Sequence, residues 1–153
     1  MLNKDEIKSR LEMIASSNDI SKKWAAVNEE LIKGTYPSLK IRERKVLRCT
    51  IETIWDMQFS NARYDEVVFR LKHKDKKLFP SKKIIDKSIG ELCEMGILKN
   101  HISEFVTRDR FSTTRTQARV LDLPDTFREE AIKGMADVFK TAMDSHLLPE
   151  KKG

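Results

Sequence analysis

The chain has 153 residues, of which 39% are hydrophobic and 35% are charged, and its formal net charge is +6. This composition excludes an intrinsically disordered chain, because such chains have too few apolar residues to form a core. The length suits one domain with added helices. The positive charge favours an acidic partner, such as nucleic acid or anionic lipid.

The N-terminal segment lacks the apolar central run of a secretory signal, and no stretch approaches the ~20 apolar residues of a membrane span. We therefore expect a cytoplasmic protein that makes no membrane contact. The two cysteines, Cys49 and Cys93, are far apart in the sequence, and in that compartment we expect both to be reduced thiols.

The positive charge is confined to one third of the chain. Residues 67–119 contain 13 Lys/Arg and 6 Asp/Glu, whereas the rest of the chain contains 17 Lys/Arg and 18 Asp/Glu. A concentration of basic residues in one segment indicates a local contact with a polyanion rather than a generally basic surface.

Apolar residues at helical spacing predict four helices in the first half of the chain. They cover residues 4–15, 18–33, 40–58 and 63–73. Gly34 and Pro37 separate the second helix from the third. A basic connector with the sequence KHKDKK follows the fourth helix, and Pro80 ends it.

The segment SKKIIDKSIGELCEMGILKN, residues 81–100, predicts a fifth helix with two different faces. Ser81 is a suitable N-cap and Gly96 a suitable C-terminal stop. Ile85, Ile89 and Leu92 fall on one side, which we expect to pack on the preceding helices. The other side carries the basic residues of the first turns.

After this helix the pattern favours β-structure. Two β-favouring runs, Ile102–Thr107 and Gln117–Leu123, predict a hairpin with a long, polar, arginine-bearing tip. Pro124 ends the hairpin, and a final helix with an apolar side extends to about Leu147. The predicted fold class is therefore mainly α with one β-hairpin (α+β).

The order helix, helix, helix, hairpin resembles the winged helix-turn-helix DNA-binding superfamily. The residues that carry the resemblance are Ser81, the three inward apolar residues of the fifth helix, and its exit MGILK, in which Gly96 precedes Ile97 and Leu98. The resemblance covers residues 40–123. It implies a winged helix-turn-helix domain over 40–123, an N-terminal helical extension over 1–39 and a C-terminal helix over 124–153.

A recognition helix of this kind enters the major groove with its N-terminal residues toward the base edges. The candidate groove contacts are Ser81, Lys82, Lys83, Asp86 and Lys87. Asp86 could accept a hydrogen bond from a cytosine amino group. The same residues on an ordinary helix would simply form a solvated face.

Arginines and small hydroxyl residues at the hairpin tip indicate contacts to phosphates or to the minor groove. The candidates there are Arg108, Arg110 and Arg115, and a flexible basic loop is the simpler alternative. Phe111 in the same tip is expected to be exposed unless a partner covers it. Lys76 and Lys77 of the connector could contact phosphates or serve only for solubility.

Other basic residues favour a structural role. Glu43 and nearby acids can pair with the basic residues of the third helix, which are Arg42, Arg44, Lys45 and Arg48. For the C-terminal helix two interpretations remain open, packing onto the N-terminal helices of the same chain or a homodimer contact.

Nothing in the sequence indicates an enzyme. His73, His101 and His146 are scattered without metal-ligand spacing, and no glycine-rich phosphate loop is present. No metal, nucleotide or other cofactor is implied. Tyr36 and Tyr64 are interpreted as packing residues.

The sequence therefore predicts a protein that binds double-stranded DNA sequence-specifically and regulates transcription, with a homodimer as a possible assembly. A replication initiator of a plasmid or virus fits the same pattern, as does a winged-helix module that binds proteins. Double-stranded RNA is disfavoured, because its deep and narrow major groove does not admit a helix.

Overall fold

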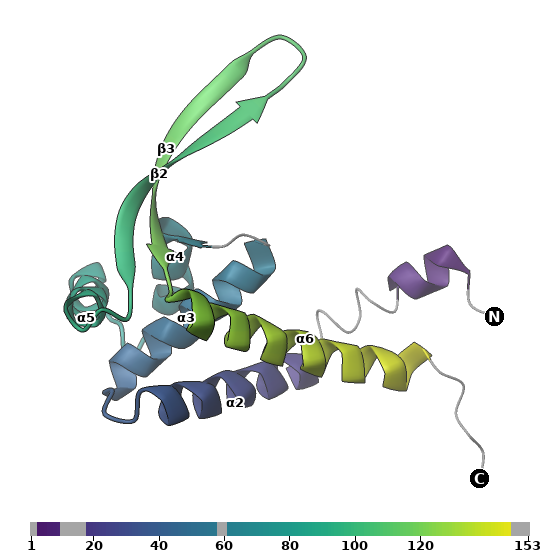
Figure 1. Ribbon diagram of the computed structural model, residues 1–153, viewed down its shortest axis with the longest axis horizontal. Helices are drawn as coiled ribbons and strands as arrows, with labels where there is room; N and C mark the ends of the chain where they lie inside the picture. The colour runs from purple at the N-terminus through teal and green to yellow at the C-terminus, as the bar shows by residue number, and fades with distance from the viewer. Residues whose placement is uncertain (1–2, 10–17, 58–60, 148–153) are drawn as a thin grey trace.

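The computed structural model describes residues 3–9, 18–57 and 61–147, which form a mainly helical protein with a small antiparallel sheet (Figure 1). Residues 4–9 are helical, and the rest of the first predicted helix lies outside the described residues. The other elements are α2 (Asn18–Thr35), α3 (Ile41–Met57), β1 (Ala62–Arg63), α4 (Tyr64–Lys74), α5 (Lys82–Glu94), β2 (Lys99–Arg108), β3 (Thr113–Asp122) and α6 (Asp125–Leu147).

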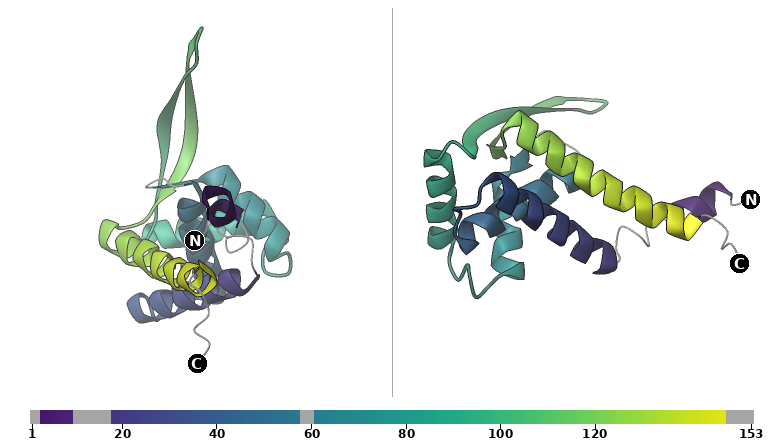
Figure 2. Two further views of the ribbon diagram at one scale, coloured as in Figure 1. Left: turned by 90° about the vertical axis from the view of Figure 1, so that its right-hand side faces the viewer. Right: turned by 60° about the horizontal axis from the view of Figure 1, so that its bottom comes forward.

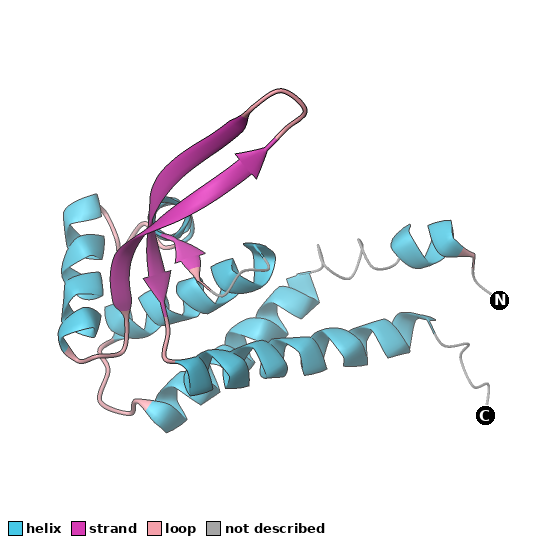
Figure 3. Cartoon of the chain, turned by 45° about the horizontal axis from the view of Figure 1, so that its top comes forward, coloured by secondary structure: helices cyan, strands magenta, loops and turns pink. Residues whose placement is uncertain are grey.

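The helices form a body from which the β2–β3 hairpin projects (Figures 1 and 2). The three strands form a sheet in the order β1-β3-β2, and both pairings are antiparallel. The sequence did not predict β1, a two-residue strand that pairs with Val120 and Leu121 of β3. Figure 3 shows this short strand beside the base of the hairpin.

The predicted long tip of the hairpin is wrong. The two strands pair without interruption from Lys99 opposite Asp122 to Arg108 opposite Thr113, so the tip has only residues 109–112. The run from Thr113 to Thr116, three threonines and one arginine, belongs to β3. Threonine is β-branched and favours an extended strand, although this run contains no apolar residue.

One hydrophobic core joins the elements from α2 to α6. It includes the predicted inward residues of α5, together with residues of α2, α3, α4 and α6. Ile41, at the first position of α3, is half exposed. Cys93 is only partly buried, and both cysteines are free thiols.

The connector between α4 and α5 is anchored by an apolar residue. Phe79 is 1% exposed, and its N–H donates to the carbonyl of Asp75 at 2.9 Å. The Nε of Arg42 donates to the carbonyl of Leu78 at 2.9 Å, which ties the connector to α3. The start of α5 is therefore fixed despite the polar sequence before it.

The end of α5 confirms the predicted glycine stop. Gly96 has φ 75°, its N–H donates to the Cys93 carbonyl at 3.0 Å, and the Ile97 N–H donates to the Leu92 carbonyl at 3.0 Å. This pair of bonds is a Schellman motif, in which glycine is favoured because a Cβ destabilises positive φ. The motif turns the chain directly into β2.

The C-terminal helix α6 packs along α2 (Figure 2). The indole N–H of Trp24 on α2 donates to the Met135 carbonyl of α6 at 3.0 Å, and the Trp24 and Phe139 rings stack with centroids 6.4 Å apart. A Cβ added at Gly134 would lie 3.0 Å from Val27, so the two helices are in close contact there. The apolar side of α6 is thus used largely within the chain.

No helix in the described part of the chain combines the length and the apolar character needed to cross a membrane.

Two glycines of the α5 region provide a matched stability test. Neither has an atom within 4 Å of an added Cβ, but only Gly96 has positive φ. Gly96→Ala should lower the free energy of unfolding by about 1 kcal/mol, the strain of a left-handed alanine. Gly90→Ala, inside the helix, should raise it by about 0.5–1 kcal/mol. Urea unfolding followed by circular dichroism measures both, and effects of the same sign would contradict the assignment of the motif.

Candidate nucleic-acid interface

The side chain of Tyr64 is the point at which α4, α5 and the hairpin meet. Tyr64 is the first residue of α4 and only 4% exposed. Its hydroxyl group donates a hydrogen bond to the carboxylate of Asp86 on α5. The guanidinium carbon of Arg119 on β3 lies 4.4 Å from the centroid of its ring, and the Nζ of Lys82 lies 5.6 Å from it. Both cations are within cation–π distance.

The Tyr64 hydroxyl stays protonated at neutral pH. Burial raises the pKa of Tyr64 to about 12, and the hydrogen bond to Asp86 acts in the same direction. A phenolate beside a carboxylate would be repelled, so the neutral form is favoured. The hydroxyl is therefore a permanent donor to Asp86, and it fixes the orientation of that carboxylate on α5.

Arg119 belongs to a row of arginines on one face of the hairpin. Its Nε donates to the Asn100 Oδ1 of the neighbouring strand at 2.6 Å. Side chains alternate between faces along a strand, and residues paired across an antiparallel ladder share a face. The register pairs Val106 with Arg115 and Arg108 with Thr113, so Arg108 and Arg115 lie on the same face as Arg119.

The predicted arginines of the hairpin are accessible, but they are not equivalent. Arg108, Arg110 and Arg115 are all exposed. Arg115 forms a long ion pair of 3.6 Å with Glu104 across the strands. Arg108 and Arg110 form no ion pair with any described residue. Exposed ion pairs of this kind are weak, so Arg115 can exchange its partner for a phosphate at little cost.

The predicted residues of α5 divide between two sides of the helix. Lys82 and Asp86 lean toward Tyr64 and the hairpin, as their contacts show. Lys83 and Lys87 are exposed. Lys87 lies at the rim of a pocket of about 380 Å³ on the other side of α5, which faces the start of α3. Lys82, Asp86 and Arg119 thus all contact Tyr64, and Lys87 lies farther round the helix.

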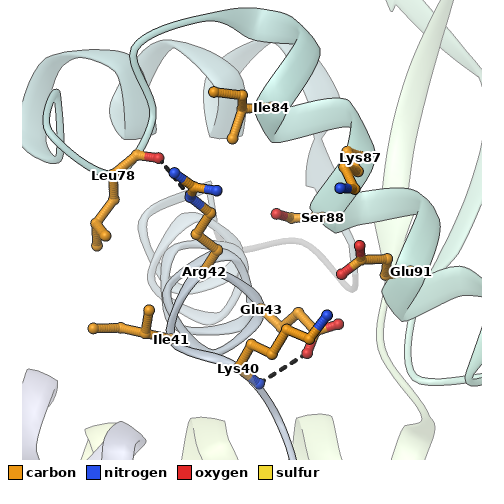
Figure 4. Close-up of a pocket in the computed structure, with 9 residues that line it drawn as sticks. All are labelled: Lys40, Ile41, Arg42, Glu43, Leu78, Ile84, Lys87, Ser88 and Glu91. Carbon is orange, nitrogen blue, oxygen red and sulfur yellow. Dashed lines mark hydrogen bonds between the residues drawn. The ribbon is translucent and has the colours of Figure 1, made fainter.

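The polar groups of this pocket serve to hold α3 in place (Figure 4). The buried carboxylate of Glu43 accepts the backbone N–H of Lys40 at 2.8 Å, which caps the start of α3. The predicted pairing of Glu43 with the basic residues of α3 is therefore replaced by this cap. Lys45 and Arg48 pair with Glu29 of α2, at 3.1 and 2.8 Å, and Arg48 also pairs with Glu52 of α3 at 3.8 Å, so the predicted pairing with nearby acids is confirmed for these two residues.

The remaining predicted residues lie at the start of α5. Ser81 occupies the N-cap position with extended backbone, but its side chain forms no capping hydrogen bond. Lys76 and Lys77 are exposed in the turn that leads into α5. All three residues precede α5 in the sequence. Within the described part of the chain, no hydrogen bond or ion pair links them to the hairpin.

The hairpin tip is ordered by one aspartate. The Asp109 Oδ1 accepts the backbone N–H of Phe111 at 2.8 Å and that of Ser112 at 2.7 Å. These two bonds hold the pKa of Asp109 below its usual range. The Asp109 N–H also donates to the Ser112 carbonyl at 2.9 Å, which closes the turn.

Sequence reasoning missed the residues that connect the interface. The prediction that Tyr64 is a packing residue is confirmed, but the sequence does not reveal its polar contacts, and Arg119 and Asn100 are not among the predicted site residues. Arg115 and Arg119 share a face of β3, but the predicted strand began at Gln117 and left Arg115 in the tip, so the shared face was not predicted. The contact with Tyr64 depends on how α4 packs beside β3, which no local pattern reveals.

Comparisons with protein-family models, with curated proteins and with solved structures found no match to this chain. No group of three or more His, Cys, Asp or Glu among the described residues is arranged to hold a metal ion. The function of the interface is therefore inferred from its own residues.

The environment of Tyr64 can be tested by an alkaline titration of absorbance at 295 nm. The difference between the wild-type protein and Tyr64→Phe isolates the ionisation of Tyr64, which should have its midpoint near pH 12. Because the pKa is higher in the folded state, the stability that this raised pKa contributes is complete below about pH 10 and is lost as the pH rises toward 12. A difference curve with its midpoint near pH 10 in a folded protein would contradict the described contact.

Proposed function

We propose that the chain is a winged helix-turn-helix protein that binds double-stranded DNA sequence-specifically and regulates transcription. In this proposal α5 is the recognition helix and the β2–β3 hairpin is the wing. The order α3, β1, α4, α5, β2, β3 supports it, as does the pairing of β1 with β3 at the base of the hairpin. The Schellman turn at Gly96, which leads α5 into β2, is a further point of support.

The observation that carries the proposal is the shared contact of Lys82 and Arg119 with the Tyr64 ring. This contact supports an arrangement in which the basic start of α5 and the Arg119 end of the arginine row flank the same ring. A duplex that receives α5 in its major groove would then have its backbone beside the hairpin. Steered binding to a polyanion requires such clustering of one sign of charge on one surface.

In the complex that we propose, Lys82, Lys83 and Asp86 lie toward the base edges, and the arginines of the hairpin contact phosphates. The Asp86 carboxylate has one oxygen, Oδ1, bound by the Tyr64 hydroxyl. Its other oxygen can accept from a cytosine amino group in a fixed direction. Lys83 is exposed and suits a guanine edge or a nearby phosphate.

Salt dependence tests whether phosphates dominate binding. A fluorescently labelled duplex, taken from a selection on random DNA, should lose affinity by roughly 10³-fold or more between about 50 and 200 mM salt if six or more phosphates are contacted. Fluorescence anisotropy measures this directly. An affinity that stays flat with salt would favour a protein partner over DNA.

The hairpin arginines should contribute uniformly to all duplexes. Replacing Arg108, Arg110 and Arg115 together with alanine should weaken specific and random DNA by similar factors and reduce the salt slope by about three. The charge-matched control replaces Lys22, Lys23 and Lys33, which are exposed on α2, away from the projecting hairpin (Figure 1). Equal losses of DNA affinity in the two triple variants would mean that net charge alone explains the effect. This outcome would contradict the proposed wing.

If α5 recognises bases, a substitution on α5 should lower the preference for the selected duplex over random DNA. Lys83→Ala should narrow the difference in affinity between the selected duplex and random DNA by about 1–3 kcal/mol, whereas the arginine variant should leave that difference unchanged. Competition binding with both duplexes measures it. If Lys83→Ala leaves the difference intact, α5 does not read the base edges through this residue.

A further inference from the structure

Phe111 at the hairpin tip is an apolar side chain presented outward. It is 91% exposed, more than any other large hydrophobic residue that the structure describes. Its backbone is held by Asp109, which accepts the N–H groups of Phe111 and Ser112. These bonds fix the backbone of the tip, and from that backbone the Phe111 ring is exposed to solvent.

The surroundings of Phe111 are cationic. Arg110 precedes it in the tip, and Arg108 ends β2 beside the tip. Both arginines are exposed and form no ion pair within the described residues. Two arginines near the ring outweigh the single negative charge of Asp109, and this excess fits a polyanion with an apolar interior better than an apolar groove on a protein. The stacked bases between the two phosphate chains of a duplex have this character.

The length of the hairpin matches the spacing of the DNA grooves. From Arg119, which lies over Tyr64 beside α5, β3 has six residue steps to Thr113 at the tip. At about 3.3 Å per residue this distance is about 20 Å. A helical turn of DNA is about 34 Å, so the next groove lies about 17 Å away. A hairpin of this length can span from a major groove that holds α5 to the adjacent minor groove.

We infer that Phe111 is a wedge that inserts between two base pairs from the minor groove and kinks the duplex. The inference rests on the proposed function and adds a mode of binding to it. Apolar wedges of this kind unstack one base step and bend DNA by about 20–90°. Pyrimidine–purine steps are the easiest to kink, so a TA or CA/TG step is expected under the tip.

The test uses the full chain and a duplex from the selection described above, labelled at its two ends for energy transfer. The wild-type protein should bend this duplex, and Phe111→Leu should keep most of the bend because leucine also serves as a wedge. Phe111→Ser should remove most of it. The matched control is Phe69→Ser, which alters another exposed phenylalanine, 57% exposed on α4. This control should bend the duplex as the wild-type protein does.

The site of insertion is located with 2-aminopurine placed in turn at each step of the minor groove beside the α5 site. Its fluorescence should rise at one step with the wild-type protein and with Phe111→Leu, but not with Phe111→Ser. Circular dichroism should show the same fold for all variants, since residue 111 makes no core contact at 91% exposure.

The outcomes separate the wedge from the proposed function. If the wild-type protein binds the duplex without bending it, or if Phe111→Ser bends it equally, the wedge is wrong while DNA binding stands. A preference for single-stranded DNA that Phe111→Leu abolishes would mean that the ring stacks on unpaired bases, which also overturns the wedge. If the wild-type protein binds no duplex at all, the proposed function itself fails.

Discussion

The buried side chain of Tyr64 determines how α5 is oriented relative to the hairpin. Its hydroxyl group donates a hydrogen bond to Asp86 of α5, and its ring contacts Arg119 of the hairpin. A helix that is attached to a core only by apolar residues can rotate or slide by small amounts at modest cost. The hydrogen bond to Asp86 and the ring contact with Arg119 add directional constraints at one place. The basic surface proposed to meet DNA is therefore set by a residue that belongs to neither of its two parts.

Much of the fold could be predicted from the sequence, because periodicity reports burial. The helical spacing of Ile85, Ile89 and Leu92 identified the inner face of α5. Gly96 marked the end of this helix, because the positive φ of that position favours glycine. The hairpin was also predicted, but its outer half was not. Thr113–Thr116 pairs through backbone hydrogen bonds in open solvent, where no apolar alternation is needed. Phe79 was missed because a single core residue in a basic connector has no period.

The sequence predicted most residues of the candidate site, but it did not predict the contacts between them. The charge pattern identified the lysines of α5 and the arginines of the tip, because clustering of one sign is visible in a sequence. The contact between Tyr64, Asp86 and Arg119 joins residues that are 22 and 55 positions from the tyrosine. Such a contact depends on the packing of three elements, and it can be found only when their relative positions are known.

The packing of α6 along α2 has a consequence for how the protein forms during translation. Trp24 gains its hydrogen-bond acceptor and one of its stacking partners only from residues more than 100 positions later in the chain. The ribosome therefore releases α2 long before the surface that covers it exists. The core around Trp24 cannot close until α6 has left the exit tunnel, and until then the nascent chain leaves the side of the indole ring that faces α6 uncovered.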